Sequence, residues 1–354
     1  MTAIGRLPHA VTRGAVLDAG ATADSIPTMK TVRAKAYSSI ANLGYGFDVF
    51  AVCVDAASDE VELSLGGRGI TLEVEGNGAG AIPTRPDRNT AGVALAKLMS
   101  DHGLREPVRV RLRKRFRPVG GLGSSAASAA AAVVAANRLF GLGLPRARLV
   151  PYAAHGETAS AGAPHADNVA AAVLGGFVIA EKRDPARILR IAPRGPLRFA
   201  IAMPRLELTT AAARRVLPES VSLEEYSQGC ARAGVIVAAI ASGDVGALGR
   251  AIEGSFAERA RAPLVPGYAE VCESARRAGA AGATMRFGSN SFSTRSPFTG
   301  SSRSPGAVNE SQPPEYQTIR GKPPARVRAS TAGPESGLEP NRSEWSQPMN
   351  ATAS

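Results

Sequence analysis

The segment that most constrains the fold is a glycine-rich stretch followed at once by an alanine-rich run without helix breakers. It reads Pro118-Val119-Gly120-Gly121-Leu122-Gly123-Ser124-Ser125-Ala126 and continues to about Phe140. Glycines let the backbone approach an anion closely, and a helix that begins at Ser124 would direct free N–H groups and its positive dipole end at that anion. The segment predicts a phosphate-binding loop. A glycine-rich turn without a ligand is the alternative.

Two common phosphate loops do not match this segment. A Walker loop requires a Lys-Ser or Lys-Thr pair after the glycines, and a dinucleotide-binding loop requires GxGxxG after an apolar strand. Neither pattern is present here. The segment is therefore neither a Walker loop nor a dinucleotide-binding fingerprint.

Hydrophobic periodicity predicts a mixed chain of strands and helices between about residues 29 and 284. The expected strands are 29–36, 61–65, 69–74, 108–116, 176–180 and 199–203, and the expected helices are 90–102, 124–140, 149–156, 223–241 and 267–278. In the run 109–117, arginines alternate with Val110, Leu112 and Phe116, as in a half-buried strand with a solvated face. Steering of phosphate by these arginines is the less favoured interpretation.

The two ends of the chain lack such periodicity. Residues 1–28 are expected to be disordered, either as a short leader or because the true start is Met29. Residues 286–354 are rich in Ser, Pro, Arg and Gly and hold few large aliphatic residues, so they are expected to be disordered as well.

Composition argues against several classes of protein. The net charge of +12 would suit nucleic acid, but the basic residues are scattered and aromatic residues make up only 5%. No apolar run is long enough to span a membrane. Cys53, Cys230 and Cys272 lie far apart without CxxC spacing, which favours neither a disulfide framework nor zinc and fits a reducing cytoplasm.

Several segments together resemble one enzyme family. Gly-Leu-Gly-Ser-Ser-Ala-Ala-Ser at 121–128 resembles the nucleotide-binding motif of the GHMP small-molecule kinases. Ala-Asn-Leu-Gly-Tyr-Gly-Phe-Asp at 41–48, His-Ala-Asp-Asn at 165–168, the Thr-x-x-x-Arg pattern that ends at Arg214 and Ala-Arg-Ala-Pro-Leu-Val-Pro-Gly at 260–267 resemble homoserine kinases. Tyr45 stands where that family usually has proline, and the loop after Pro118 is one residue shorter than usual.

The resemblance implies a fold and a reaction. The fold would be the α+β two-part GHMP kinase fold, with an N-terminal ATP-binding domain like ribosomal protein S5 domain 2 at 29–185 and a truncated ferredoxin-like domain at 186–285. The reaction would be phosphorylation of the L-homoserine hydroxyl by ATP with Mg²⁺, in threonine biosynthesis in the cytoplasm. By family analogy the protein would be a homodimer, with no nucleic-acid or membrane partner.

The resemblance also implies roles for individual residues. ATP would contact Asn89 and the loop residues Pro118, Val119, Gly120, Gly121, Leu122, Gly123, Ser124, Ser125 and Ala126. The alternative role of Asn89 is to cap a helix. Mg²⁺ would be held by Glu157 with Ser124 or Ser125. Homoserine would be bound by Asn42, Asp48, His165, Arg214 and Arg261, where a carboxylate suits its amino group and guanidinium suits its carboxylate.

Asn168 bears on the mechanism. It stands where mevalonate kinase, a relative, carries an aspartate regarded as its base, and an amide cannot accept a proton in that way. Catalysis is therefore expected to rest on alignment and charge neutralisation, with Glu157, Asn168 and Ser124 as the catalytic residues.

The resemblance stops after about Met285, where the family's third motif is expected. If Arg286 to Ser291 are encoded CGG TTC GGG TCC AAC AGC, the neighbouring frame reads Gly-Ser-Gly-Pro-Thr-Ala, which is that motif. We therefore hypothesise a frameshift in the gene or in its sequencing.

Three other functions stay open from the sequence. They are a catalytically dead nucleotide-binding remnant, another GHMP kinase such as mevalonate or shikimate kinase, and a nucleic-acid-binding protein.

Overall fold

The structure, a computed structural model, describes residues 16–17, 31–115, 121–161, 165–181, 184, 186–204, 210–285 and 316–318. Seven strands of these residues form one sheet in the order β1-β2-β3-β5-β4, with β6 paired to β3 and β7 paired to β6. They are β1 (Val16–Leu17), β2 (Thr31–Ala41), β3 (Phe50–Leu65), β4 (Ile70–Gly76), β5 (Val108–Lys114), β6 (Phe177–Ala180) and β7 (Ile188–Ile191). Among these seven described strands, only β4 and β5 pair in parallel.

The outer face of the sheet explains the arginine-rich run. In β5, Val108, Val110 and Leu112 are buried, while Arg111 and Arg113 face outward. Arg111 pairs with Glu62 and Glu73, and Arg113 with Glu60 and Glu75, at N–O distances of 2.6 to 3.5 Å. The half-buried strand is thus confirmed, and these arginines serve a solvated ion-pair ladder.

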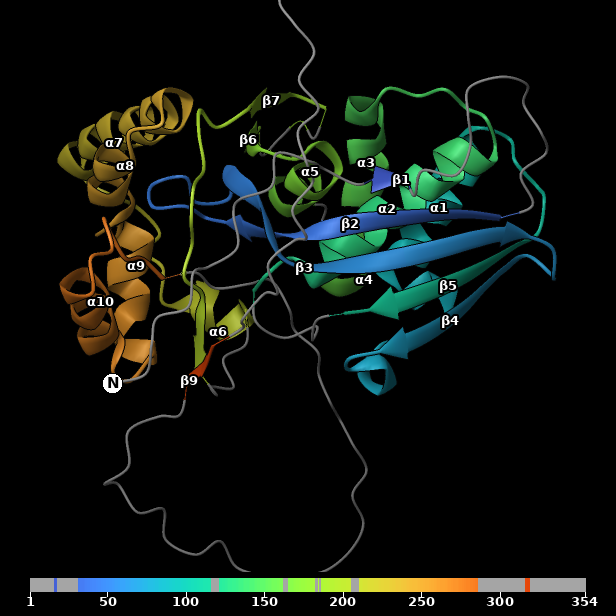
Figure 1. The fold of residues 1–354 in the computed structure, drawn as a ribbon, viewed down its shortest axis with the longest axis horizontal. Coiled ribbons are helices and arrows are strands. Elements are labelled where there is room, and N and C mark those ends of the chain that lie inside the picture. Colours follow the sequence, from blue (N-terminus) through green and yellow to red (C-terminus); the bar gives the residue numbers. More distant parts are fainter. Residues whose placement is uncertain are drawn as a thin grey trace, which may run out of the picture. The chain divides into compact units, whose positions relative to one another are not determined.

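Helices cover the other face of the sheet and lie behind the strands in the view of Figure 1. They are α1 (Thr90–Asp101), α2 (Ser124–Leu139), α3 (Arg146–Gly156), α4 (Thr158–Ala161) and α5 (Ala166–Leu174). Residues 126–136 of α2 are all buried, and this helix contacts β2, β3, α1, α3 and α5. Its alanines allow close approach on every side, because interaxial distances depend on the side chains at the contact.

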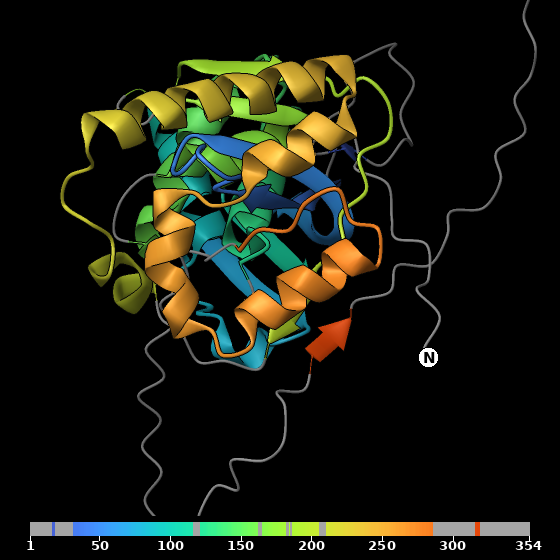
Figure 2. The ribbon, with the colours of Figure 1, turned by 90° about the vertical axis from the view of Figure 1, so that its left-hand side faces the viewer.

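A second group of helices follows the sheet in sequence and faces the viewer in gold and orange in Figure 2. It comprises α6 (Thr210–Arg215), α7 (Leu223–Ser242), α8 (Val245–Ile252), α9 (Phe256–Arg261) and α10 (Tyr268–Arg277). A second hydrophobic core joins α7 and α8 to the sheet: Ile236 and Ile240 pack with Phe50 and Phe177. The start of β3 is therefore held between the two groups of helices.

The remaining elements are short. The described residues include three 3₁₀ turns, η1 (Ala79–Ala81), η2 (Pro86–Arg88) and η3 (Ala262–Leu264), and β8 (Ala202–Pro204) pairs with β9 (Tyr316–Thr318). The five long helices and all six strands expected from the sequence are found with shifted ends. β7, α5, α8 and α9 were not predicted, because their short lengths give weak periodicity.

Two segments expected to lack structure contain strands. β1 pairs with the outer side of β2, and β9 pairs with β8. Disorder of the two ends of the chain stays a prediction. A free strand edge offers unpaired N–H and C=O groups, and β-formers such as Val16 and Tyr316 can satisfy them. The other residues of 1–28 and of 286–354 lie outside the described residues. The domain boundary at 185/186 stays a prediction.

No helix among the described residues is both long enough and apolar enough to cross a membrane.

Candidate active site

The glycine-rich loop leads into α2 as predicted. The helix begins at Ser124, and Gly121 and Gly123 adopt left-handed backbone angles, with φ of 69° and 67°. The Ser39 N–H of β2 donates to the Leu122 carbonyl at 3.0 Å and fixes the loop on the sheet. Pro118, Val119 and Gly120 lie outside the described residues. The N–H groups of the first turn of α2 are therefore placed to bind an anion.

Gly123 stands where a side chain would be crowded and the backbone strained, with a φ of 67°. A Cβ there would lie 2.3 Å from Ser39 Oγ and 3.1 Å from Asn168 Oδ1, and these two atoms hydrogen-bond each other at 2.9 Å. The absence of a side chain thus allows β2, α5 and the phosphate loop to meet.

Gly123→Ala is expected to cost about 1 to 3 kcal/mol more stability than Gly141→Ala, because it adds overpacking to backbone strain. Gly141, at the other end of α2, has a φ of 62° and open space around its Cβ position, which makes it a matched control. Urea unfolding and ATP binding are the measurements, and only Gly123→Ala should weaken binding. Equal losses would show that the contact with Ser39 is unimportant.

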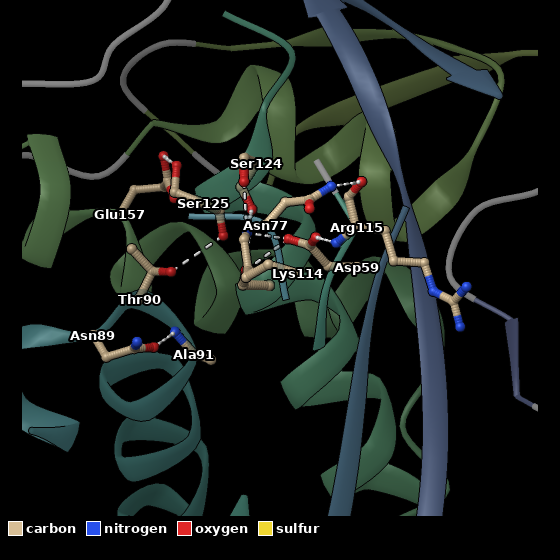
Figure 3. A network of polar contacts seen from close by, with 11 residues as sticks. Asp59, Asn77, Asn89, Thr90, Ala91, Lys114, Arg115, Ser124, Ser125 and Glu157 are labelled. Carbon is tan, nitrogen blue, oxygen red and sulfur yellow. Dashed lines mark hydrogen bonds and ion pairs between the residues drawn. The ribbon is translucent and has the colours of Figure 1, made fainter. Parts of the chain in front are cut away.

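A buried ion pair lies directly behind the loop (Figure 3). Lys114, the last residue of β5, pairs with Asp59 of β3, and their side chains are only 2% and 0% exposed. The ammonium also donates to the carbonyl and hydroxyl of Ser124 and to Ser128 Oγ at 2.9 Å. Burial is the main influence on both groups, raising the pKa of Asp59 and lowering that of Lys114, and their attraction opposes both shifts.

This ion pair was not predicted from the sequence. Lys114 continues the buried alternation of Val110 and Leu112, and Asp59 lies on the buried face of β3 with Val61 and Leu63. A charged residue in a buried register was the signal that could have identified them. The pair ties Ser124, and with it the start of α2, to the sheet.

Ser125 faces a second buried acid. Its hydroxyl donates to Glu157 Oε2 at 3.1 Å, and Glu157 is 2% exposed. The other oxygen, Oε1, is buried and accepts no hydrogen bond from the part of the chain that is described. Burial raises the pKa of Glu157 to about 7, and the negative charge of Asp167 adds to the shift.

This orphaned oxygen fits a cation. Magnesium prefers oxygen ligands and is usually held by one or two protein groups together with phosphates. Over the described residues no cluster of three or more His, Cys, Asp or Glu could hold a metal alone. Since Ser124 Oγ already accepts from Lys114, Ser125 is the serine of the pair that is oriented toward Glu157.

Asn89 and Thr90 support the same region. The Asn89 side chain accepts from the N–H of Ala91 at 3.0 Å and donates to the Pro83 carbonyl at 2.8 Å, so it caps α1. Thr90 Oγ1 donates to the Ser125 carbonyl at 3.2 Å. The structure therefore shows the capping role of Asn89, and a contact with adenosine stays a prediction.

Residues 165–168 form the start of α5. Asp167 accepts from the N–H of Asn168 at 2.7 Å, and the Asn168 amide oxygen accepts from Ser39 beside Gly123. Asn168 is thus adjacent to the phosphate loop, as a nearly fully buried side chain. His165 stands at the N-cap position, partly exposed.

Three of the predicted substrate residues, Asp48, Arg214 and Arg261, lie around Phe47, in the loop between β2 and β3. Arg214 donates through both amino groups to the Asp48 carboxylate at 3.1 to 3.2 Å, and Arg261 donates to the Ala213 carbonyl at 2.9 Å. The guanidinium carbons of Arg214 and Arg261 lie 5.6 and 5.0 Å from the centre of the Phe47 ring. Burial, and next the charge of Arg214, lowers the pKa of Arg261.

The same loop contains Asn42, whose side chain accepts from the Asp48 N–H at 2.7 Å. From the sequence, Asp48 and Arg214 are expected to bind different groups of a ligand, and here they pair with each other. Together with Arg261 they provide one carboxylate and two guanidinium groups side by side.

Strand β2 links the two clusters. Ser39 contacts the phosphate loop, and Asn42 begins the loop that contains Asp48. Three residues of extended strand separate them by roughly 10 Å. An anion at the start of α2 and an amino acid near Asp48 would thus be neighbours.

The chain is similar to one family model and to several known proteins. The family model for the GHMP kinases N terminal domain matches residues 89–176. A homoserine kinase of Methanococcus maripaludis (strain C5) is 37% identical over 246 residues, which cover 69% of this chain and 81% of the relative.

Two solved structures are also similar. The crystal structure of homoserine kinase from Cytophaga hutchinsonii has a TM-score of 0.68 at 31% identity, with 74% of this chain and 83% of that chain covered. The L. major mevalonate kinase in complex with R-mevalonate has a TM-score of 0.57 at 17% identity, with 73% and 85% covered. At that identity the second similarity concerns the fold alone.

Proposed function

The chain belongs to the homoserine kinases, within the GHMP kinases, and we propose that it transfers the terminal phosphoryl group of ATP to the hydroxyl of L-homoserine. The products would be O-phospho-L-homoserine and ADP, and the α+β two-part fold is that of the family. The observation that carries the proposal is the phosphate loop at the start of α2 with the Ser125–Glu157 pair beside it.

The loop would bind the phosphates of ATP through backbone N–H groups. Gly121 and Gly123 shape it, and the Lys114–Asp59 pair holds Ser124 at the first position of the helix. Glu157 and Ser125 would hold Mg²⁺, which supplies neutralisation of phosphate charge when bound. This assignment prefers Ser125 to Ser124, because the Ser124 hydroxyl is already engaged.

Homoserine would lie near Phe47. Its amino group would be bound by Asp48 and its carboxylate by Arg214 and Arg261, with contacts from Asn42 and His165. Binding would exchange part of the Asp48–Arg214 pair for contacts with the opposite charges of the amino acid.

The reaction would proceed without a strong general base. Asn168 is an amide beside the loop, and Asp167 is engaged with the N-terminus of α5. A loose phosphoryl-transfer transition state requires little early deprotonation, so alignment of the hydroxyl with the phosphate can provide most of the acceleration.

Coupled ADP release with MgATP and L-homoserine tests the proposal, on this chain and on a version with the third motif restored by a frame correction. Turnover with homoserine, and none with mevalonate or shikimate, is the expected result. Turnover only in the restored version would also support the frameshift. ATP binding without turnover in either would instead favour a catalytically dead remnant.

A cytoplasmic homodimer without nucleic-acid or membrane partners remains proposed by family analogy. Size-exclusion chromatography with light scattering tests whether the protein is a dimer. Resequencing of the gene tests the frameshift, which an intact reading frame would contradict.

A further inference from the structure

The loop between β2 and β3 is held in an unfavourable backbone conformation. Asn42 and Asp48 have φ of 60° and 57°, angles that residues with side chains rarely adopt. Such residues persist only where the surrounding structure over-determines them. Because Asp48 lies in this loop, whatever restrains the loop also sets the position of its carboxylate.

Tyr45, at the centre of the loop, reaches two other segments. Its hydroxyl donates to Glu225 Oε1 of α7 at 3.0 Å and lies 3.2 Å from the Gly254 carbonyl, which precedes α9. Glu225 in turn forms an ion pair with Arg259 of α9, and Arg259 also donates to the Gly254 carbonyl. One hydroxyl therefore connects the loop to α7 and α9.

The ring of Tyr45 also packs closely against α7. A Cβ at Gly229 of α7 would lie 3.0 Å from its Cδ1 atom, so this glycine makes room for the ring. The Arg232 guanidinium carbon lies 5.8 Å from the ring centre, and Arg232 donates to the Glu253 carbonyl at 2.8 Å. Gly229 and Arg232 thus form a seat for Tyr45 on α7.

We propose that Tyr45 is a positioning residue for substrate: through Glu225 and Arg259 it fixes the loop that contains Asp48 relative to α9, which contains Arg261. The inference rests on the proposed function, because Asp48 and Arg261 are its homoserine-binding groups. Arg259 and Arg261 belong to the same short helix, so the network sets the spacing between the carboxylate and the guanidinium that would hold the two ends of the amino acid.

Tyr45→Phe tests this by removing one hydroxyl while keeping the ring in its seat. Tyr37→Phe is the matched control, because Tyr37 is partly buried in the preceding strand and its hydroxyl makes no hydrogen bond within the described residues. Glu225→Ala is the second variant, since it removes the acceptor from a partly exposed site and should fold. Affinities for L-homoserine and ATP are measured by calorimetry, and hydrogen exchange is measured over residues 42–50 in the ligand-free chain.

Tyr45→Phe and Glu225→Ala are expected to weaken homoserine binding about 5- to 10-fold, as for loss of one hydrogen bond, and to speed exchange in residues 42–50. ATP affinity should change less than about twofold, because the hydroxyl does not touch the phosphate loop. A purely structural role would lower both affinities together, and that result would overturn the inference.

Behaviour identical to Tyr37→Phe in affinity and exchange would overturn it as well. Failure of the proposed function has a different signature: the unmodified chain would then bind ATP but not homoserine, whatever the variants do. Faster exchange in the variants with unchanged homoserine affinity would contradict the positioning role alone.

Discussion

Replacing Lys114 with methionine is expected to lower the free energy of unfolding by roughly 3 to 5 kcal/mol, because the Asp59 carboxylate would stay buried without its ammonium partner. The change should also remove the two hydrogen bonds that Ser124 accepts from Lys114. Urea denaturation measures the stability, and ATP affinity should fall with it because Ser124 begins α2.

The controls for this prediction come from the same strands. Arg111→Met removes a half-exposed ion-pairing residue of β5 and should cost less than about 1 kcal/mol. Asp59→Asn with Lys114→Met removes both charges, and this double variant should be more stable than Lys114→Met alone. If the double variant is no more stable, the cost of the single change does not come from an isolated buried charge.

The second large effect concerns Glu157. Glu157→Gln is expected to lower turnover of homoserine roughly 10²- to 10³-fold, because the carboxylate charge proposed to hold Mg²⁺ is lost while the shape is kept. MgATP should raise the thermal stability of the unmodified protein more than that of the variant. Glu73→Gln, at a side chain that is 76% exposed, is the control and should change neither property.

The pH dependence of the free energy of unfolding, measured without metal, tests the environment of Glu157 independently. The pKa of about 7 in the folded protein lies above the ordinary value of 4.5, so between these pH values the folded state keeps a proton that the unfolded state has lost. The contribution of Glu157 therefore becomes less favourable as pH rises through this window, by on the order of 3 kcal/mol at about 1.4 kcal/mol for each pH unit.

This shift is measured as a difference. In EDTA, the stability of Glu157→Gln relative to the unmodified protein should increase between about pH 5 and about pH 8, because the glutamine does not titrate. Other titrating groups cancel in the comparison. A relative stability that is the same at both pH values would mean that Glu157 has an ordinary pKa, and its burial would then not disfavour the charge.

Local patterns predicted the parts of the fold that depend on neighbours in sequence. The alternation of Val110 and Leu112 identified β5, and the glycines before Ser124 identified the start of α2, since backbone freedom and periodicity are local properties. Short elements were missed, because α8 and α9 span only two turns or so and owe their form to packing and to caps at Asp244 and Ser255.

Motifs located the candidate site, but not the pairing inside it. The sequence assigned Asp48, Arg214 and Arg261 to one ligand, and the structure gathers them around Phe47. It could not show that Asp48 and Arg214 pair with each other, because they are 166 positions apart. Nor could it distinguish Ser124 from Ser125, since that depends on which hydroxyl meets Lys114.

The sequence by itself determined a phosphate loop before an alanine-rich helix, the alternating strands and the kinase family that the motifs indicate. Only the tertiary structure decided that Lys114 and Asp59 are a buried pair and that Tyr45 joins the loop of Asp48 to α7. It also decided that one oxygen of Glu157 is buried without a hydrogen bond from the described residues. The physical reason is that desolvation and hydrogen bonding of a side chain depend on residues brought near by folding, and these lie tens to hundreds of positions away along the chain.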